Sequence, residues 1–125
     1  MSVVYDAGAL IAAERNDRVV WADHRARLEA GEVPLATAPV VAQVSRSSRQ
    51  VQLRRFLRGC DMAPFASNEA HEVGGLLART GTTDVVDAHV VLIASARRYT
   101  VLTSDPADLA QLSQQLSSAV DIRVV

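Results

Sequence analysis

The sequence predicts an α/β fold, a three-layer α/β/α sandwich around a mostly parallel central sheet. Short apolar runs rich in β-branched residues recur along the chain, and segments with helical periodicity separate them. No two of these runs are joined by a hairpin turn. Strands that alternate with helices favour parallel pairing, with helices on both faces of the sheet. The chain of 125 residues, 49% of them hydrophobic, is suited to one domain spanning residues 1–125.

The first half of the chain is expected to hold three strands and four helices. The apolar run 2–5 is a strand that stops at Asp6, and a helix follows at 7–15. Asp17 can cap the next helix, which ends at Gly31. The remaining elements are a strand at 34–37, a helix opened by Pro39 and interrupted at Ser47 and Ser48, a helix at 50–57 ended by Gly59, and a strand at 61–65.

The second half alternates in the same way. Ser67 or Asn68 is expected to cap a helix that ends at Gly81, and Thr82 and Thr83 are expected to cap the next helix, at 84–98. That second helix is apolar around most of its circumference, so it is expected to be largely buried. The remaining elements are a strand at 99–103, a helix opened by Pro106 and a strand at 122–125.

Composition excludes several kinds of protein. The formal net charge is -1, so a nucleic acid would have to meet a local basic patch. Cys60 is the single cysteine, which rules out an internal disulfide and a cysteine zinc cage and fits a reducing compartment. No apolar stretch approaches the roughly 20 residues that span a bilayer, and the N-terminus lacks the features of a signal peptide. We therefore expect a cytoplasmic protein without a membrane partner.

Four acidic side chains are expected to converge at one edge of the sheet. Asp6 and Asp105 each follow a strand, and ligands of such sheets bind outside the carboxyl ends of the strands. Asp84 and Asp87 are three residues apart and therefore share a helix face. Carboxylates at short range repel one another unless a cation joins them, and oxygen ligands favour Mg²⁺ or Mn²⁺. The sequence predicts a divalent-metal pocket that can activate water for phosphoryl chemistry.

Purely structural roles also fit some of these acids. Asp84 and Asp108 lie at helix N-termini, where carboxylates cap the helix or offset its dipole. A structural role fits Asp87 and Asp6 less well, because they lie among apolar residues, where an unpaired carboxylate is costly. The three histidines share no ligand spacing, and we expect packing or surface roles for them.

One basic cluster is suited to binding phosphate groups. Its members are Arg46, Arg49, Arg54, Arg55 and Arg58. Guanidinium groups suit phosphate recognition, and Arg54 and Arg58 are spaced to share a helix face. A solvated helix face explains the cluster equally well. Because no aromatic residues are interleaved, contacts with a nucleic-acid backbone are expected more than base stacking.

Three segments stand out together in their order and spacing. They are VVYDAGALIAAE near the N-terminus, TTDVVDAHVVLIASARRY in the middle of the second half, and VLTSDPADL after it. Together they resemble PIN-domain ribonucleases, specifically the VapC-type toxins of type II toxin–antitoxin pairs. The resemblance implies a PIN-like sandwich, Mg²⁺-dependent endonucleolytic cleavage of RNA by a metal-activated water, inhibition by a cognate antitoxin, and a homodimer.

The resemblance also implies roles for individual residues. Metal ligands would be Asp6, Asp87 and Asp105, with Asp84 as a supporting acid and Asp108 as a weaker one. A hydroxyl of Thr103 or Ser104 would orient a carboxylate or a bound water.

The chain departs from the family pattern at Gln43, where relatives usually carry a catalytic glutamate that joins the acidic pocket. Gln43 keeps a carbonyl oxygen but removes one negative charge from the site. The alternative is therefore a catalytically weakened PIN-like module that binds RNA or antitoxin without efficient cleavage.

Other α/β proteins with acids at strand ends fit less well. A phosphoacceptor receiver domain needs a lysine beside its acceptor, and this chain has no lysine. A haloacid-dehalogenase-type phosphatase needs a second acid two residues after the first, where Gly8 stands. Neither a P-loop nor a dinucleotide glycine fingerprint is present.

Overall fold

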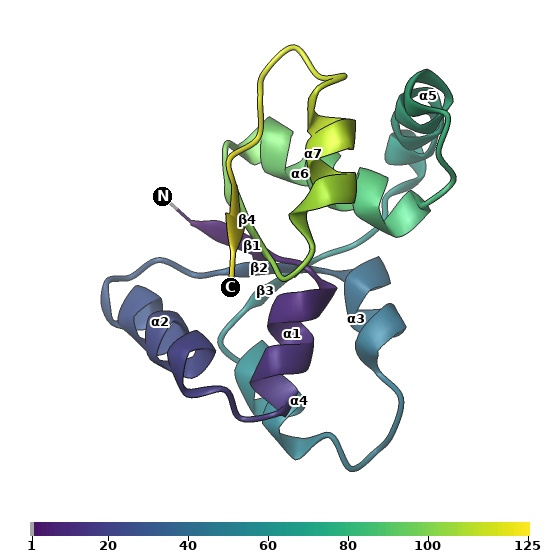
Figure 1. Cartoon of the computed structure of the whole chain (residues 1–125). Helices are drawn as coiled ribbons and strands as arrows, with labels where there is room; N and C mark the ends of the chain where they lie inside the picture. The colour runs from purple at the N-terminus through teal and green to yellow at the C-terminus, as the bar shows by residue number, and fades with distance from the viewer. Residues whose placement is uncertain (1) are drawn as a thin grey trace.

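A computed structural model describes residues 2–125 and shows a five-stranded sheet between two groups of helices (Figure 1). The strands are β1 (Val3–Tyr5), β2 (Leu35–Thr37), β3 (Asp61–Ala63), β4 (Thr100–Thr103) and β5 (Ile122–Val124). They lie side by side in the order β3-β2-β1-β4-β5, and each neighbouring pair is parallel. The predicted α/β class with a parallel central sheet is confirmed.

The helices divide between the two faces of the sheet. Those of the described residues are α1 (Ala7–Glu14), α2 (Arg18–Glu29), α3 (Ala38–Val44), α4 (Val51–Leu57), α5 (Ala70–Thr80), α6 (Val85–Arg97) and α7 (Pro106–Ser113), with a 3-10 turn η1 (Ser67–Glu69). Helix α1 packs against α2, α3 and α4, whereas α5, α6 and α7 pack against one another (Figure 1). None of these helices is long and apolar enough to cross a membrane.

The central strands form the core because both of their faces are covered. Every residue of β1 is buried, as is every residue of β4. Strands covered on both faces are continuously apolar, whereas strands with one exposed face alternate apolar and polar residues. Residues 3–5 and 101–102 show the continuous pattern. Helix α6 is largely buried, as its apolar circumference predicts. The carboxyl ends of β1 and β4 are therefore fixed by the best-packed part of the molecule.

Asp84 caps α6, and the predicted capping role of Thr82 and Thr83 is wrong. The Oδ1 atom of Asp84 accepts a hydrogen bond from the backbone N–H of Asp87 at 3.0 Å. The Thr82 hydroxyl lies instead 2.7 Å from the hydroxyl of Thr80, at the end of the preceding helix. Asp84 is one residue closer to the first helical turn, so its carboxylate is the acceptor within reach.

The start of α5 also differs from the prediction. Ser67 and Asn68 do not cap this helix, because they lie within the turn η1 that precedes it. The Oε1 atom of Glu69 accepts a hydrogen bond from the backbone N–H of Ala66 at 2.8 Å and holds that turn.

Gly8 allows α1 to approach the loop that follows β4. A Cβ atom at this position would overlap the Oγ atom of Ser104 and lie 2.8 Å from its backbone nitrogen. We expect Gly8→Ala to lower the free energy of unfolding by about 1–3 kcal/mol, the usual range for overpacking, although alanine favours helix. Thermal unfolding measures the change. The matched control is Gly74→Ala in α5, where a Cβ meets nothing within 4 Å and should stabilise by about 0.5–1 kcal/mol; equal stabilisation by both would contradict the close approach.

Candidate functional site

Asp6 is positioned to bind a ligand rather than to cap a helix. It follows β1 and stands at the N-cap of α1, yet its side chain makes no capping hydrogen bond. The side chain is 7% exposed, and the Thr103 hydroxyl donates to its Oδ2 atom at 2.9 Å. Its Oδ1 atom is buried without a hydrogen-bond partner among the described residues. Such an oxygen is costly to leave unmatched, so this atom is available to a donor or a cation.

Thr103 links two of the predicted acids. The side chain is fully buried at the end of β4, and its Oγ1 atom accepts a hydrogen bond from the backbone N–H of Asp105 at 3.1 Å. The same hydroxyl donates to Asp6, so one side chain fixes the positions of both residues. Asp105 is the N-cap of α7 without a side-chain cap bond, and its carboxylate is exposed. Of the two hydroxyls predicted to orient an acid, Thr103 makes the contact and Ser104 faces Gly8.

The remaining acids line a cavity of about 300 Å³. Its walls include Asp84 and Asp87 from the start of α6 and Asp108 from the first turn of α7. Asp84 combines two positions that the sequence left as alternatives, because it caps α6 and also faces this cavity.

The carboxylates raise one another's pKa. Burial, followed by the charges of Asp84, Asp6 and Asp108, raises the pKa of Asp87 to about 7. Burial is also the main reason why the pKa of Asp6 is raised; the backbone N–H of Ala7 and the Thr103 hydroxyl oppose this rise, and the charges of Asp84 and Asp105 add to it. No arginine or histidine forms an ion pair with any of these acids within residues 2–125. The crowded negative charge is therefore not neutralised by the protein's own basic groups.

The chemistry of this donor set fits a hard divalent cation. Carboxylate oxygens are the preferred ligands of Mg²⁺ and Mn²⁺, and the unpartnered Oδ1 atom of Asp6 supplies one that is already desolvated. As the side chains stand, however, no group of three or more histidine, cysteine, aspartate or glutamate residues in the described chain is arranged to hold a metal ion. The residues thus have the right chemistry for Mg²⁺ without a ready-made coordination shell.

The raised pKa of Asp87 predicts how stability depends on pH. In the unfolded chain its pKa returns to about 3.9, so between that pH and about 7 the folded state binds the proton more tightly. The stabilisation that this group contributes is fully present below about pH 3.9 and is lost as the pH rises through about 7. We expect Asp87→Asn to flatten this decline by on the order of 1–2 kcal/mol, allowing for partial exposure. Thermal melts in chelator from pH 4 to 8 check this, and parallel curves for the two proteins would contradict it.

Gln43 and the predicted arginines are not joined to the acids by any described contact. Gln43 lies exposed on α3 and makes no side-chain hydrogen bond to a described residue. The predicted basic residues Arg46, Arg49, Arg54, Arg55 and Arg58 are all exposed, in the loop after α3 and on α4. Arg54 donates to the backbone oxygen of Ser48 at 2.6 Å, and Arg55 donates to Gln52 at 3.2 Å.

The histidines are packing or surface residues, as predicted. His24 is buried beside Tyr5 and stacks on Phe56, with ring centroids 3.8 Å apart. His89 is fully buried with its Nε2 atom 3.3 Å from the carboxylate of Glu69, and His71 is exposed.

Two of the solved structures that this chain resembles illustrate its fold. One is VapBC2 from Rickettsia felis, in a crystal structure bound to a DNA fragment from their promoter, with a TM-score of 0.70 and 14% identity over 100% of this chain and 99% of that chain. The other is PAE2754 from Pyrobaculum aerophilum, with a TM-score of 0.64 and 16% identity over 97% of this chain and 83% of that chain. No family model and no curated protein matches the sequence. These structural similarities confirm the predicted PIN-like fold.

Proposed function

Because the chain has the PIN-like fold of a VapC protein, we propose that it is a Mg²⁺- or Mn²⁺-dependent endoribonuclease and the toxin of a type II toxin–antitoxin pair. The observation that carries the proposal is the unpartnered, buried oxygen of Asp6 among crowded carboxylates at the carboxyl end of the sheet. Structural carboxylates are normally paired or hydrogen-bonded. A site that collects acids without basic partners is suited to a cation and, through it, to phosphate.

Each acid has a distinct part in this proposal. Asp6, Asp87 and Asp105 are the proposed ligands, and Asp84 supports them from the α6 N-cap. Thr103 is a positioning residue, because its hydroxyl holds the Asp6 carboxylate in one orientation and leaves Oδ1 free. A bound Mg²⁺ would supply Lewis-acid activation of a phosphodiester and of the attacking water. Burial of Asp6 excludes bulk water from this side of the site.

The proposed partners are RNA and a cognate antitoxin. VapBC2 from Rickettsia felis was solved bound to a DNA fragment from their promoter. By analogy with VapC-type toxins, we propose that this chain pairs with an antitoxin. We also propose that it forms a homodimer and acts in the cytoplasm. The five exposed arginines of the basic cluster are proposed to contact the RNA backbone.

The alternative function is a weakened PIN-like module that binds RNA or antitoxin without efficient cleavage. Two observations favour it: Gln43 brings no negative charge, and no described group of three ligands is arranged to hold a metal ion. One missing carboxylate lowers the affinity of a site for Mg²⁺ because its binding depends on few charged ligands.

Cleavage of total RNA by wild type and Gln43→Glu separates these functions. We expect wild type to cut RNA with Mg²⁺ or Mn²⁺ but not with chelator, and Gln43→Glu to cut about tenfold faster, in line with the size of metal-affinity effects from neighbouring residues. The matched control is Gln115→Glu, an exposed glutamine after α7, which should behave as wild type.

Activity in Gln43→Glu alone would support the weakened module. An absence of cutting by all three proteins, with RNA still bound, would refute the enzyme.

A further inference from the structure

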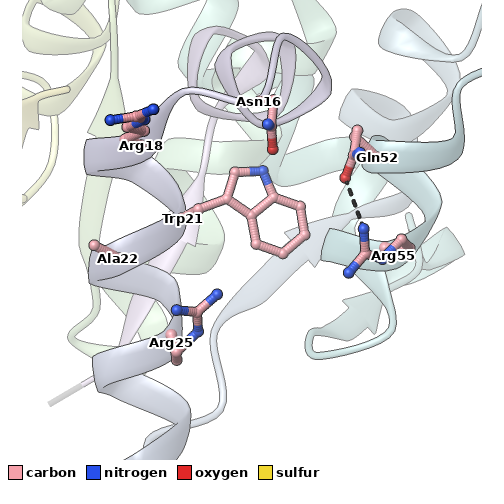
Figure 2. A pocket seen from close by; sticks show the side chains of 7 residues that line it. All are labelled: Asn16, Arg18, Trp21, Ala22, Arg25, Gln52 and Arg55. Carbon is pink, nitrogen blue, oxygen red and sulfur yellow. Dashed lines mark hydrogen bonds between the residues drawn. The ribbon is translucent and has the colours of Figure 1, made fainter.

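A second cavity, of about 330 Å³, lies between α2 and α4, and none of the proposed acids lines it (Figure 2). Its polar and aromatic lining comes from Asn16, Arg18, Trp21, Arg25, Gln52 and Arg55. We call these six residues the α2–α4 pocket. Figure 2 shows the indole ring of Trp21 between the α2 arginines on one side and Gln52 with Arg55 on the other.

The pocket gathers positive charge that the protein does not neutralise. Arg18 and Arg25 lie two helical turns apart on one face of α2, and Arg55 reaches in from α4. All three are exposed, and none forms an ion pair with an acid in the described chain. Three guanidinium groups around one cavity repel each other, so an anion bound among them is favoured.

Trp21 is held as a fixed aromatic wall of this pocket. Its Nε1 atom donates to the backbone oxygen of Ala13 at 3.0 Å. Its ring meets Phe56 and His24 edge-on, at interplanar angles of 85° and 88°. The guanidinium of Arg55 lies 5.8 Å from the ring centroid. The hydrogen bond and the edge contacts fix the ring, so that it can present a face to a planar ligand at little entropic cost.

We propose that the α2–α4 pocket binds one nucleotide of a single-stranded RNA, with the base on Trp21 and the flanking phosphates on the arginines. Guanidinium groups with an aromatic platform are the combination that binds single-stranded nucleic acid without reading its sequence. The amides of Asn16 and Gln52 both donate and accept, as base edges require. The volume is at the lower end of the roughly 300–1,000 Å³ of small-ligand sites, which suits a single nucleotide.

This inference rests on the proposed function for its choice of RNA, and it adds a second contact point beyond the acids. Asp6 precedes the first residue of α1, and Asn16 lies beyond the end of this helix. The eight residues of α1, at about 1.5 Å each, place the two ends of the helix roughly 12 Å apart. An RNA strand of several nucleotides is therefore needed to reach from the pocket to Asp6.

The test uses the emission of Trp21, the chain's single tryptophan, as the readout. The full chain carrying Asp6→Asn is titrated in chelator with a short single-stranded RNA, so that binding is followed without cleavage. We expect the RNA to quench the emission of Trp21. Arg25→Gln or Arg55→Gln should each weaken binding about tenfold. Each should also reduce the slope of log K against log salt concentration by about 0.7 in magnitude. The control is Arg97→Gln, exposed on α6 behind the other face of the sheet, which should bind as the parent does.

Three results would overturn the proposal. They are RNA binding without a change in Trp21 emission, an equal loss of affinity in the Arg97→Gln control, and tighter, Arg25-dependent binding of a glutamate-rich peptide, which would assign the pocket to a protein segment. The parent and each variant should show the same thermal unfolding, so a loss of affinity reports the pocket rather than the fold. Because the assay needs no cleavage, a protein that binds here but never cuts RNA would refute the proposed nuclease and leave the pocket intact.

Discussion

Asp6→Asn is expected to abolish RNA cleavage and, in chelator, to make the protein more stable. The substitution removes a proposed metal ligand, and we expect activity to fall by at least about 100-fold, because losing even a partner of a metal ligand costs up to that much. The asparagine oxygen can still accept the Thr103 hydrogen bond. Its amide replaces a desolvated charge that Asp84 and Asp105 repel, so we expect a gain of about 1 kcal/mol, or roughly 3–5 °C in Tm.

The opposite signs of the two effects distinguish a functional acid from a structural one. A residue that only supported the fold would lose activity and stability together. The matched control is Asp61→Asn, an exposed acid at the start of β3, which should leave both cleavage and Tm unchanged. Cleavage at the wild-type rate by Asp6→Asn would remove Asp6 from the proposed site.

The sequence was sufficient to place Asp6 and Asp105 after two strands, which prove to be neighbours in the sheet, and Asp84 and Asp87 at the start of α6. That inference needed only two local signals, an apolar run that stops at an acid and a helix that begins with one. Parallel strands place their carboxyl ends at the same edge of a sheet, so residues that directly follow two such strands are expected to lie near each other. The hydroxyl that orients Asp6 was expected at Thr103 or Ser104 from the family resemblance alone, and the structure shows the hydrogen bond at Thr103.

The local sequence pattern could not predict which distant segments pack against one another. The arginine cluster defined by the sequence lay in the loop before α4 and along α4 to its end, and it lacked aromatic residues, so base stacking was not expected. In the structure Trp21, thirty-four positions before Arg55, supplies the aromatic ring, and the α2 arginines join it. A periodic signal was present in Arg18, Trp21 and Arg25, but which helix would face them depended on tertiary contacts.

The cluster of aromatic rings behind Trp21 connects the core to the α2–α4 pocket. Tyr5 lies 2.8 Å from the Nδ1 atom of His24, and His24 stacks on Phe56. Burial raises the pKa of the Tyr5 hydroxyl and lowers the pKa of His24. Both groups are therefore neutral near pH 7, and the hydrogen bond between them joins two uncharged partners. Phe56 touches all three neighbouring rings, with centroids 4.9 Å from Tyr5 and 5.1 Å from Trp21.

Phe56→Ala is accordingly expected to destabilise the protein by about 3–5 kcal/mol, as for other buried phenylalanines. Phe56 is 0% exposed and its loss leaves a cavity among three rings, whereas Phe65 is 38% exposed. Phe65→Ala is the matched control and should cost less than half as much, because the ring leaves no enclosed cavity. Denaturant unfolding measures both losses of stability. The emission of Trp21 reports whether the packing around its ring has changed. Equal losses from the two substitutions would mean that the aromatic cluster does not carry the packing of α2 and α4; a larger loss at Phe56 with altered Trp21 emission would show that the core itself shapes the α2–α4 pocket.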